Sequence, residues 1–127
     1  MKKATSKYAD VYLLPILAKN VPAYRKMAQA AGRIFCKHGA LAYREYIGSD
    51  LKAEEGIMAF PQVIKLKSDE VLIYASVEFK SESHRNKVMK LIFKDPALEE
   101  MMTGKPIFDV KRMVYGGFKI LVETGEK

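Results

Sequence analysis

The chain has 127 residues, of which 49% are hydrophobic and 29% are charged, and this size and composition are those of a single globular domain. A membrane-spanning helix is excluded, because no apolar run approaches the roughly 18 to 20 residues that a bilayer requires. A single cysteine, Cys36, excludes an internal disulfide bond.

The N-terminal segment is basic and lacks the hydrophobic stretch of a secretory signal. We therefore expect residues 1–7 to be a flexible basic leader, residues 8–124 to form the domain, and the protein to be cytoplasmic. The net charge is +7, and Lys2, Lys3 and Lys7 of the leader contribute to it. The other cations are spread along the chain rather than gathered into one basic run, which favours a solvated surface over a nucleic-acid partner.

The first half of the chain predicts a strand, a helix and a second strand. Tyr8 to Leu17 is rich in strand-forming residues, and Asn20-Val21-Pro22 signals the start of a helix that Gly39 ends. The helix has an apolar stripe at spacings of three and four residues: Tyr24, Met27, Ala28, Ala31, Ile34, Phe35 and His38. Its opposite face carries Arg25, Lys26, Gln29, Arg33 and Lys37. Ala40 to Gly48 then predicts a strand, and Ser49 to Gly56 a loop.

The second half predicts a strand, two helices and a last strand. Val71 to Lys80 is the strand, and the serines that follow are caps for a helix with Val88, Leu91 and Ile92 on its apolar side. Asp95-Pro96 starts a short helix that ends at Gly104. The last strand, Val110 to Glu123, contains Gly116-Gly117, which indicates a bulge or the close approach of another backbone.

The order of these elements predicts an α+β fold of the ferredoxin-like split βαβ type. In this fold a four-stranded antiparallel sheet carries its helices on one face. Because side chains alternate along a strand, we expect one set of apolar residues to face the helices. This set is Ala9, Val11, Leu13, Pro15 and Leu17 of the first strand with Val71, Ile73, Ala75, Val77 and Phe79 of the third.

The opposite sheet face is then a mixture of aromatic, apolar and charged side chains. It comprises Tyr8, Asp10, Tyr12, Leu14, Ile16, Arg44, Tyr46, Leu72, Tyr74, Ser76, Glu78, Lys111, Met113 and Tyr115. Such a face is too apolar for full exposure and too polar for a dry core. Packing against a second copy around a shared lumen resolves this conflict and predicts a homodimer, whereas a monomer with one wet sheet face is the alternative.

A few side chains are candidates for chemistry. His84 starts a helix, where the helix dipole lowers its pKa and favours a neutral imidazole, so it is the candidate acid-base residue. His38 is expected to interact with the end of the first helix, although it could also line a pocket mouth. Asp10 is expected to pair with Arg44, and Glu78 with Lys111. These groups are either structural ion pairs or charges that recognise a ligand.

No metal-binding pattern is present in the sequence. Two histidines and one distant cysteine do not make a structural zinc site, and no Cys-x-x-Cys or His-Glu-x-x-His spacing occurs. We therefore expect neither a metal nor a cofactor. Cys36 is not expected to be a nucleophile, because no base or helix N-terminus in the pattern lowers its pKa.

Four stretches together resemble the YbaA-like family, also called domain of unknown function 1428. They are His38 to Glu45, Phe60 to Lys65, Ser83 to Arg85 and Phe108 to Phe118, and they follow one another in the family's order. The resemblance implies a dimeric α+β barrel, and it supplies no catalytic residue. The chain departs from the family pattern at Ala75-Ser76 and at Val11, so the lumen is expected to differ in shape.

The leading functional hypothesis is a homodimeric small-molecule binder, or a cofactor-independent enzyme that acts on an aromatic or enolisable metabolite in the lumen. The residues expected to line the lumen are Asp10, Tyr12, Arg44, Tyr46, Tyr74, Glu78, Lys111 and Tyr115. One alternative is a haem-binding or monooxygenase-like enzyme with a histidine as axial ligand. The other is an RNA- or DNA-binding protein, since RNA-recognition modules use the same scaffold.

Overall fold

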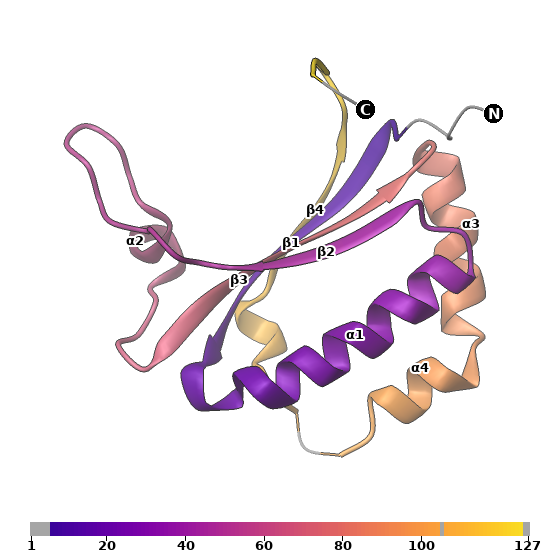
Figure 1. Ribbon diagram of the computed structural model, residues 1–127, viewed down its shortest axis with the longest axis horizontal. Helices are drawn as coiled ribbons and strands as arrows, with labels where there is room; N and C mark the ends of the chain where they lie inside the picture. Colours follow the sequence, from indigo (N-terminus) through magenta and orange to yellow (C-terminus); the bar gives the residue numbers. More distant parts are fainter. Residues whose placement is uncertain (1–5, 105, 126–127) are drawn as a thin grey trace.

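The computed structural model describes residues 6–104 and 106–125 (Figure 1). Residues 1–5 of the expected leader lie outside the described residues. The strands are β1 (Tyr8–Leu17), β2 (Ala42–Ile47), β3 (Glu70–Phe79) and β4 (Val114–Lys119). The helices are α1 (Val21–Lys37), α2 (Phe60–Ile64), α3 (Glu82–Phe93) and α4 (Pro96–Met101), with short 3-10 turns η1 (Ala18–Asn20) and η2 (Val110–Arg112).

The strands form one antiparallel sheet in the order β2-β3-β1-β4. Helices α1 and α3 cover one face of this sheet, and the opposite face carries no helix layer among the described residues (Figure 1). The predicted ferredoxin-like split βαβ fold is therefore confirmed. No helix in the described part of the chain is long and apolar enough to cross a membrane.

Local signals in the sequence explain where the helices begin and end. The Ser81 hydroxyl accepts a hydrogen bond from the backbone N–H of His84 and so caps α3, while Asp95 caps α4 in the same way through Ala97. After α1, Gly39 takes a left-handed φ of 116°, which glycine adopts without steric cost. The predicted side-chain cap at Asn20 is absent from α1, and the Asn20 amide N–H donates to the carbonyl of Ile107.

The pairing of β1 with β3 determines which residues face the helices. Directly opposite residues of an antiparallel pair share a face, and the register joins Tyr8 to Phe79, Asp10 to Val77 and Tyr12 to Ala75. The prediction for β3 was correct. The prediction for β1 was wrong by one residue, so Tyr8, Asp10, Tyr12, Leu14 and Ile16 lie beneath the helices with the odd-numbered side chains of β3.

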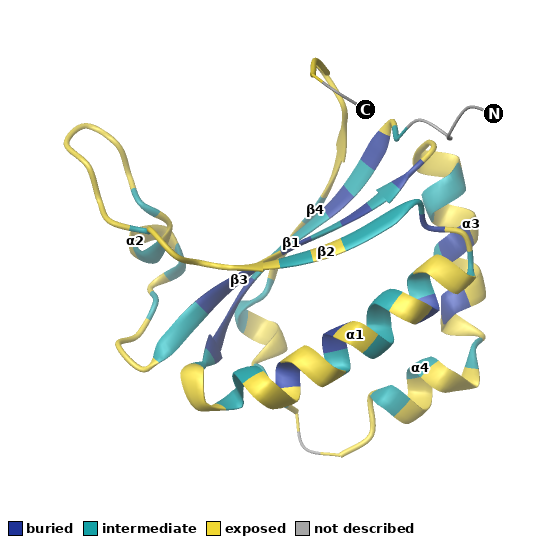
Figure 2. Ribbon diagram, in the orientation of Figure 1, coloured by how far each residue is buried: buried dark blue, intermediate teal, exposed yellow. Residues whose placement is uncertain are grey.

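The core between sheet and helices has two parts. Near α3 it is built from Tyr8, Val77, Phe79, Val88 and Ile92, and near the start of α1 from Leu14, Ile16, Tyr24, Ala28 and Ile73. Tyr12 packs against both parts. From Ile73 to Phe79, buried residues alternate with less buried ones along β3, and buried residues line the inner side of α1 and α3 (Figure 2). Burial of these large apolar side chains holds the helices on the sheet.

The face without helices, called the open face below, consists of alternating residues from all the strands. It comprises Ala9, Val11, Leu13, Pro15, Leu17, Ala42, Arg44, Tyr46, Glu70, Leu72, Tyr74, Ser76, Glu78, Val114, Gly116 and Phe118. Arg44, Tyr46, Tyr74 and Glu78 lie on this face as predicted, whereas Tyr115 shares the helix-covered face with Tyr12. The open face is therefore more apolar than the mixture that the sequence predicted.

The last strand is shorter than predicted. Asp109 accepts a hydrogen bond from the backbone N–H of Lys111 at 3.0 Å and stabilises the turn η2, so β4 begins only at Val114. Lys111 is consequently exposed in a turn rather than on the sheet, and Met113 packs into the core beside α1. Both were expected on the mixed face, and both expectations were wrong.

The glycine pair of β4 makes room for a side chain rather than a bulge. The ladder between β1 and β4 runs without interruption through Gly116 and Gly117. A Cβ atom at Gly117 would overlap the hydroxyl of the buried Tyr8. We expect Gly117→Ala to lower the free energy of unfolding by about 1–3 kcal/mol in a chemical denaturation experiment, because Tyr8 must leave its packing position.

The neighbouring glycine provides a matched control for this prediction. A Cβ atom at Gly116 lies 3.3 Å from Cε1 of Phe118, an exposed ring that can rotate away. Gly116→Ala should therefore change the free energy of unfolding of the single folded chain by only about 0.5 kcal/mol. Equal losses for the two variants would contradict the role assigned to Tyr8.

Candidate functional site

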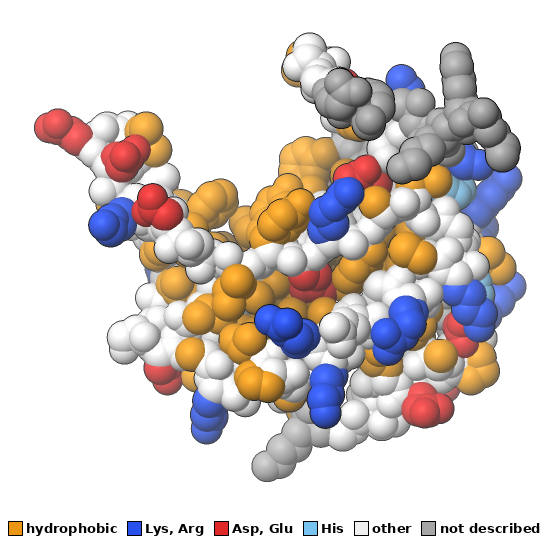
Figure 3. All heavy atoms as spheres, in the orientation of Figure 1, with side chains coloured by type: hydrophobic (Ala, Val, Ile, Leu, Met, Phe, Trp, Pro, Cys, Tyr) orange, Lys and Arg blue, Asp and Glu red, His pale blue; other side chains and the backbone are white. Residues whose placement is uncertain are grey.

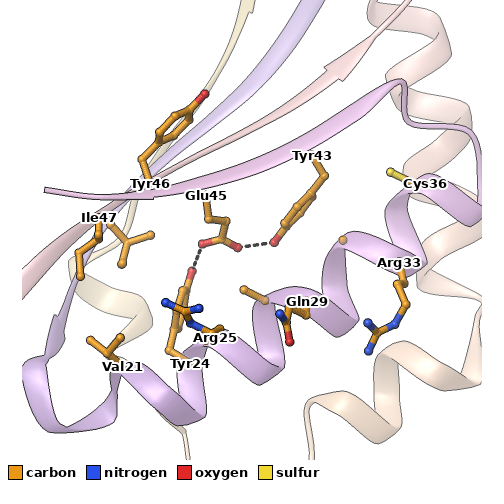
Figure 4. A pocket seen from close by; sticks show the side chains of 13 residues that line it. Val21, Tyr24, Arg25, Gln29, Arg33, Cys36, Tyr43, Glu45, Tyr46 and Ile47 are labelled. Carbon is orange, nitrogen blue, oxygen red and sulfur yellow. Dashed lines mark hydrogen bonds between the residues drawn. The ribbon is translucent and has the colours of Figure 1, made fainter.

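A pocket of about 750 Å³ opens between α1 and β2 (Figure 4). Helix α1 contributes Tyr24, Arg25, Gln29 and Arg33, and β2 contributes Tyr43 and Glu45 from its helix-covered face. Because β2 is an edge strand, no further strand in the described part of the chain closes this side of the helix–sheet interface. The pocket thus combines an aromatic wall with charged groups of both signs.

The carboxylate of Glu45 is the central polar group of the pocket. Tyr24 donates its hydroxyl hydrogen to Oε1, and Tyr43 donates to Oε2 (Figure 4). Burial raises the pKa of both tyrosines, and the negative charge of Glu45 and the hydrogen bonds to it raise them further. Both hydroxyls therefore stay protonated and hold the carboxylate in place as donors.

The charges in and around the pocket are not paired with one another. Within the described part of the chain, no lysine, arginine or histidine nitrogen lies within 4.0 Å of the Glu45 carboxylate. Arg25 and Arg33 are exposed on α1, and neither forms an ion pair with a described residue. A half-buried anion and two unpaired cations thus border the same cavity.

Asp10 lies at the centre of a separate, buried polar cluster. Its side chain is 0% exposed, and Oδ1 accepts a hydrogen bond at 2.7 Å from Arg85 and another at 3.2 Å from the Tyr115 hydroxyl. Arg85 also donates to the Tyr115 oxygen at 2.8 Å, and its guanidinium lies 5.1 Å from the ring centroid of Tyr8. The cluster therefore ties β1, α3 and β4 together.

The predicted ion pairs of the mixed face were wrong in their partners. Asp10 pairs with Arg85 instead of Arg44, because Asp10 faces the helices and Arg44 faces away from them. On the open face, Glu78 pairs with Arg44 at 3.2 Å and not with Lys111. Glu78 also accepts a hydrogen bond from the Ser6 hydroxyl at 2.7 Å.

Burial leaves Asp10 in an unfavourable setting. Its Oδ2 atom is buried and has no hydrogen-bond partner among the residues that the structure describes. Desolvation raises the pKa of Asp10, and the charge of Arg85 and the hydrogen bonds from Tyr115 and Arg85 offset part of this effect. Asp10 does not line the pocket between α1 and β2. Its arrangement is that of a structural ion pair that depends strongly on Arg85.

The two histidines each have a defined partner. Nε2 of His38 lies 2.7 Å from Oδ2 of Asp95, and this contact joins the end of α1 to the start of α4. The hydrogen bond with His38 is the largest of the effects that lower the pKa of Asp95 to about 2. Nδ1 of His84 accepts the backbone N–H of Lys80 at 2.9 Å. Burial lowers the pKa of His84, as do the charges of Lys80 and Lys87.

These contacts limit what the histidines offer to a ligand. Because Nδ1 of His84 is already an acceptor, the neutral ring carries its proton on Nε2.

Cys36 is exposed at the pocket edge. Among the described residues, no group of three or more histidine, cysteine, aspartate and glutamate side chains could hold a metal ion.

The predicted lumen residues thus fall into separate places. Arg44, Tyr46, Tyr74 and Glu78 share the open face, where the rings of Tyr46 and Tyr74 pack with their centroids 5.6 Å apart. Asp10, Tyr12 and Tyr115 lie on the helix-covered face, with the rings of Tyr12 and Tyr115 4.9 Å apart. Lys111 lies in η2.

The pocket residues were missed at the level of sequence, although a signal for them exists. Arg44 and Tyr46 were assigned correctly to the face away from the helices, so alternation puts Tyr43 and Glu45 beneath them. A glutamate expected beneath a helix requires a polar partner, and Tyr24 lies on the apolar stripe of α1. Arg25, Gln29 and Arg33 were interpreted as a purely solvated helix face.

The comparison with known families agrees with the architecture. A family model described as a protein of unknown function, DUF1428, matches residues 7–110. The chain belongs to the DUF1428 family. The predicted resemblance to YbaA-like proteins is thereby confirmed.

DUF1428 relatives match over almost their whole length. The chain is 31% identical over 117 residues to the uncharacterized protein YbaA of Escherichia coli strain K12, covering 92% of this chain and 98% of the relative. The YbaA protein of Shigella flexneri gives the same identity and coverage. These matches establish relationship along the chain rather than a shared short motif.

A solved structure has the same fold as this DUF1428 chain. It is a dimeric ferredoxin-like protein from an uncultured marine organism, with a TM-score of 0.56 and 11% sequence identity. The alignment covers 98% of this chain and 96% of that one. At this identity the likeness concerns the fold alone.

Proposed function

We propose that the protein is a homodimeric small-molecule-binding protein whose ligand occupies the pocket between α1 and β2. The observation that carries this proposal is the Glu45 carboxylate, held by two protonated tyrosines within a cavity of about 750 Å³. Cavities of roughly 300–1,000 Å³ with mainly apolar walls and a few convergent polar groups are typical of small-molecule sites. The ligand site thus differs from the sheet-face lumen that the sequence predicted.

The open face is the proposed dimer interface. Tyr46 is 51% exposed and Phe118 59% exposed, and they lie with Leu13, Tyr74 and Val114 on that face. In Figure 3, hydrophobic side chains gather in the hollow between the segment that carries α2 and the C-terminal segment. An apolar patch of this kind marks an interaction surface.

A second copy is the occupant that best fits this face. The open face pairs its exposed cation, Arg44, with an anion, Glu78, so two copies related by a two-fold axis bring no net charge together. A solved protein of the same fold is itself described as dimeric. Helices then cover the outer faces of two sheets that pack against each other.

A pocket-filling variant tests the ligand site. Gln29 is exposed on α1 and lines the pocket, so Gln29→Trp puts an indole into the cavity without removing core packing. We expect aromatic fragments to perturb the amide NMR signals of Gly32, Tyr43 and Ile47, and Gln29→Trp to weaken this binding about tenfold or more. Titration followed by two-dimensional NMR measures both effects.

The control for this test lies on the same helix. Lys26 is exposed but does not line the pocket, so Lys26→Trp adds the same side chain outside the cavity and should leave fragment binding unchanged. The proposal fails if no fragment perturbs the pocket signals, or if both tryptophan variants behave alike.

A further inference from the structure

We propose that the ligand is a zwitterion with a cationic amine at its inner end, a carboxylate at its outer end and an apolar or aromatic spacer between them. This inference rests on the proposed pocket function and names the chemical class that the pocket selects. It follows from how charge is distributed along the cavity.

The inner end of the pocket requires a cation. The hydroxyls of Tyr24 and Tyr43 each donate a hydrogen bond to one oxygen of the Glu45 carboxylate. A carboxylate has about four lone-pair positions, so acceptor capacity remains for an N–H donor of the ligand. No described residue places a positive charge within 4.0 Å of it, and a ligand amine would supply that charge in a half-buried setting where attraction exceeds its value in water.

The aromatic wall favours the same group. Tyr24 and Tyr43 both line the cavity, and the ring of Phe35 packs against the ring of Tyr43 with the centroids 5.5 Å apart. Tyrosine rings attract ammonium groups through their negative faces, and this attraction strengthens as the cation loses water. A carboxylate between two tyrosines is therefore suited to an amine and unsuited to an anion.

The outer end of the pocket requires an anion. Arg25 and Arg33 are eight positions apart on α1, with Gln29 midway, and this spacing puts all of them on one side of the helix. They border the pocket, and neither is paired with an acidic group in the described ranges. Arginine binds carboxylates through paired N–H donors, so an anionic end of a ligand fits this rim.

The separation of these charges defines the spacer. The arginines and Glu45 border one cavity, yet no nitrogen and oxygen of these residues come within 4.0 Å. A ligand with only one charge leaves one end of the pocket unsatisfied. A molecule with both charges, held apart by an apolar body, satisfies both ends at once.

A matched set of probes tests this inference. The probes are 4-(aminomethyl)benzoate, benzylamine, 4-methylbenzoate and 4-methylbenzyl alcohol, which share one ring and differ in charge. Titrations at pH 7 followed by NMR should show that 4-(aminomethyl)benzoate binds about tenfold or more tightly than each of the other probes. The perturbed amides should include those of α1 and β2.

Variants then assign each preference to its residues. Glu45→Gln removes the charge and keeps a carbonyl acceptor, so this variant should bind 4-(aminomethyl)benzoate no more tightly than 4-methylbenzoate. The double variant Arg25→Ala with Arg33→Ala should bind 4-(aminomethyl)benzoate no more tightly than benzylamine. Lys26→Ala removes an exposed cation that does not border the pocket and should preserve both advantages.

The possible outcomes separate this inference from the proposed function. If 4-methylbenzyl alcohol binds in the pocket as well as the zwitterion does, the inference is overturned while the binding pocket stands. If no probe perturbs the pocket, both fail. If Glu45→Gln does not fold, the double variant Arg25→Ala with Arg33→Ala still tests the inference, because both arginines are exposed. An unchanged preference of this double variant for the zwitterion over benzylamine would refute the assignment of the carboxylate to the arginine rim.

Discussion

Replacement of Arg85 by Met should lower the free energy of unfolding by about 3–5 kcal/mol, because removing one partner of a buried ion pair leaves the other charge uncompensated. Asp10 is 0% exposed and the side chain of Arg85 only 15%, so water cannot replace the lost guanidinium. Urea denaturation at pH 7 measures the loss. The double variant Asp10→Asn with Arg85→Met removes both charges and should recover much of it.

An exposed ion pair provides the control. The side chain of Lys37 on α1 is 65% exposed in its pair with Asp95, and pairs with an exposed partner contribute only about 0–1 kcal/mol. Lys37→Met removes a cation away from the proposed dimer interface and should therefore cost far less than Arg85→Met. Similar losses in the free energy of unfolding for the two variants would show that the buried Asp10 pair contributes no more to stability than an exposed pair.

The pH dependence of Arg85→Met follows from the raised pKa of Asp10. Burial already raises this pKa in the folded protein, and removal of Arg85 takes away the largest effect that lowers it. A carboxyl group whose folded pKa exceeds its unfolded pKa destabilises the fold fully at pH values above the folded pKa, and this penalty decreases as the pH falls from the folded pKa to the unfolded pKa. The stability gap between Arg85→Met and the wild type should therefore narrow towards acidic pH.

The order of elements could be predicted from the sequence because it depends on local signals. The strand Tyr8–Leu17 has the predicted bounds, and Ser81 and Asp95 cap the helices that they were expected to begin. Each of these signals acts within one or two turns of its own position. The four-stranded antiparallel sheet was predicted from the βαββαβ pattern.

The orientation of β1 could not be predicted because β1 lies inside the sheet. It pairs with β3 on one side and β4 on the other, and apolar residues occur on both of its faces. Alternation therefore gave no contrast along most of the strand. Asp10 was the one position that could have indicated which face of β1 lies beneath the helices. Its partner Arg85 lies on α3, however, and only the tertiary fold brings that helix next to β1.

The pocket was hidden for a different reason. Tyr24 belongs to the apolar stripe of α1, while Arg25 and Arg33 belong to its polar face, so each residue has an ordinary structural explanation. The pocket arises only where this helix crosses the edge strand β2 with Glu45 beneath it. Side-chain patterns identify the two surfaces, and their crossing depends on packing.

Tyr74→Asp should convert the protein from a dimer to a monomer in solution. Tyr74 lies on the open face, beside the ring of Tyr46, and the proposed interface would bury the new carboxylate in both copies. An unpaired buried charge costs several kcal/mol, enough to shift the dissociation constant by orders of magnitude. Light scattering at tens of micromolar protein measures the change in mass.

The same substitution on the other side of the sheet should have a different result. Tyr12 packs against both parts of the core beneath the helices, so Tyr12→Asp should unfold the chain rather than dissociate a folded dimer. Circular dichroism separates these outcomes, because the Tyr74→Asp monomer keeps its helices. Lys26→Glu, on the exposed side of α1, should leave both mass and spectrum unchanged.

The contrast between these variants tests the interface independently of the ligand. A wild-type protein that is a monomer at tens of micromolar, or a Tyr74→Asp variant that remains a dimer, would exclude the open face as the dimer contact. The pocket between α1 and β2 lies on the other side of the sheet, where Glu45 contacts Tyr24 and Tyr43 of the same chain. Because its central contacts need no second copy, a folded Tyr74→Asp monomer should still bind 4-(aminomethyl)benzoate.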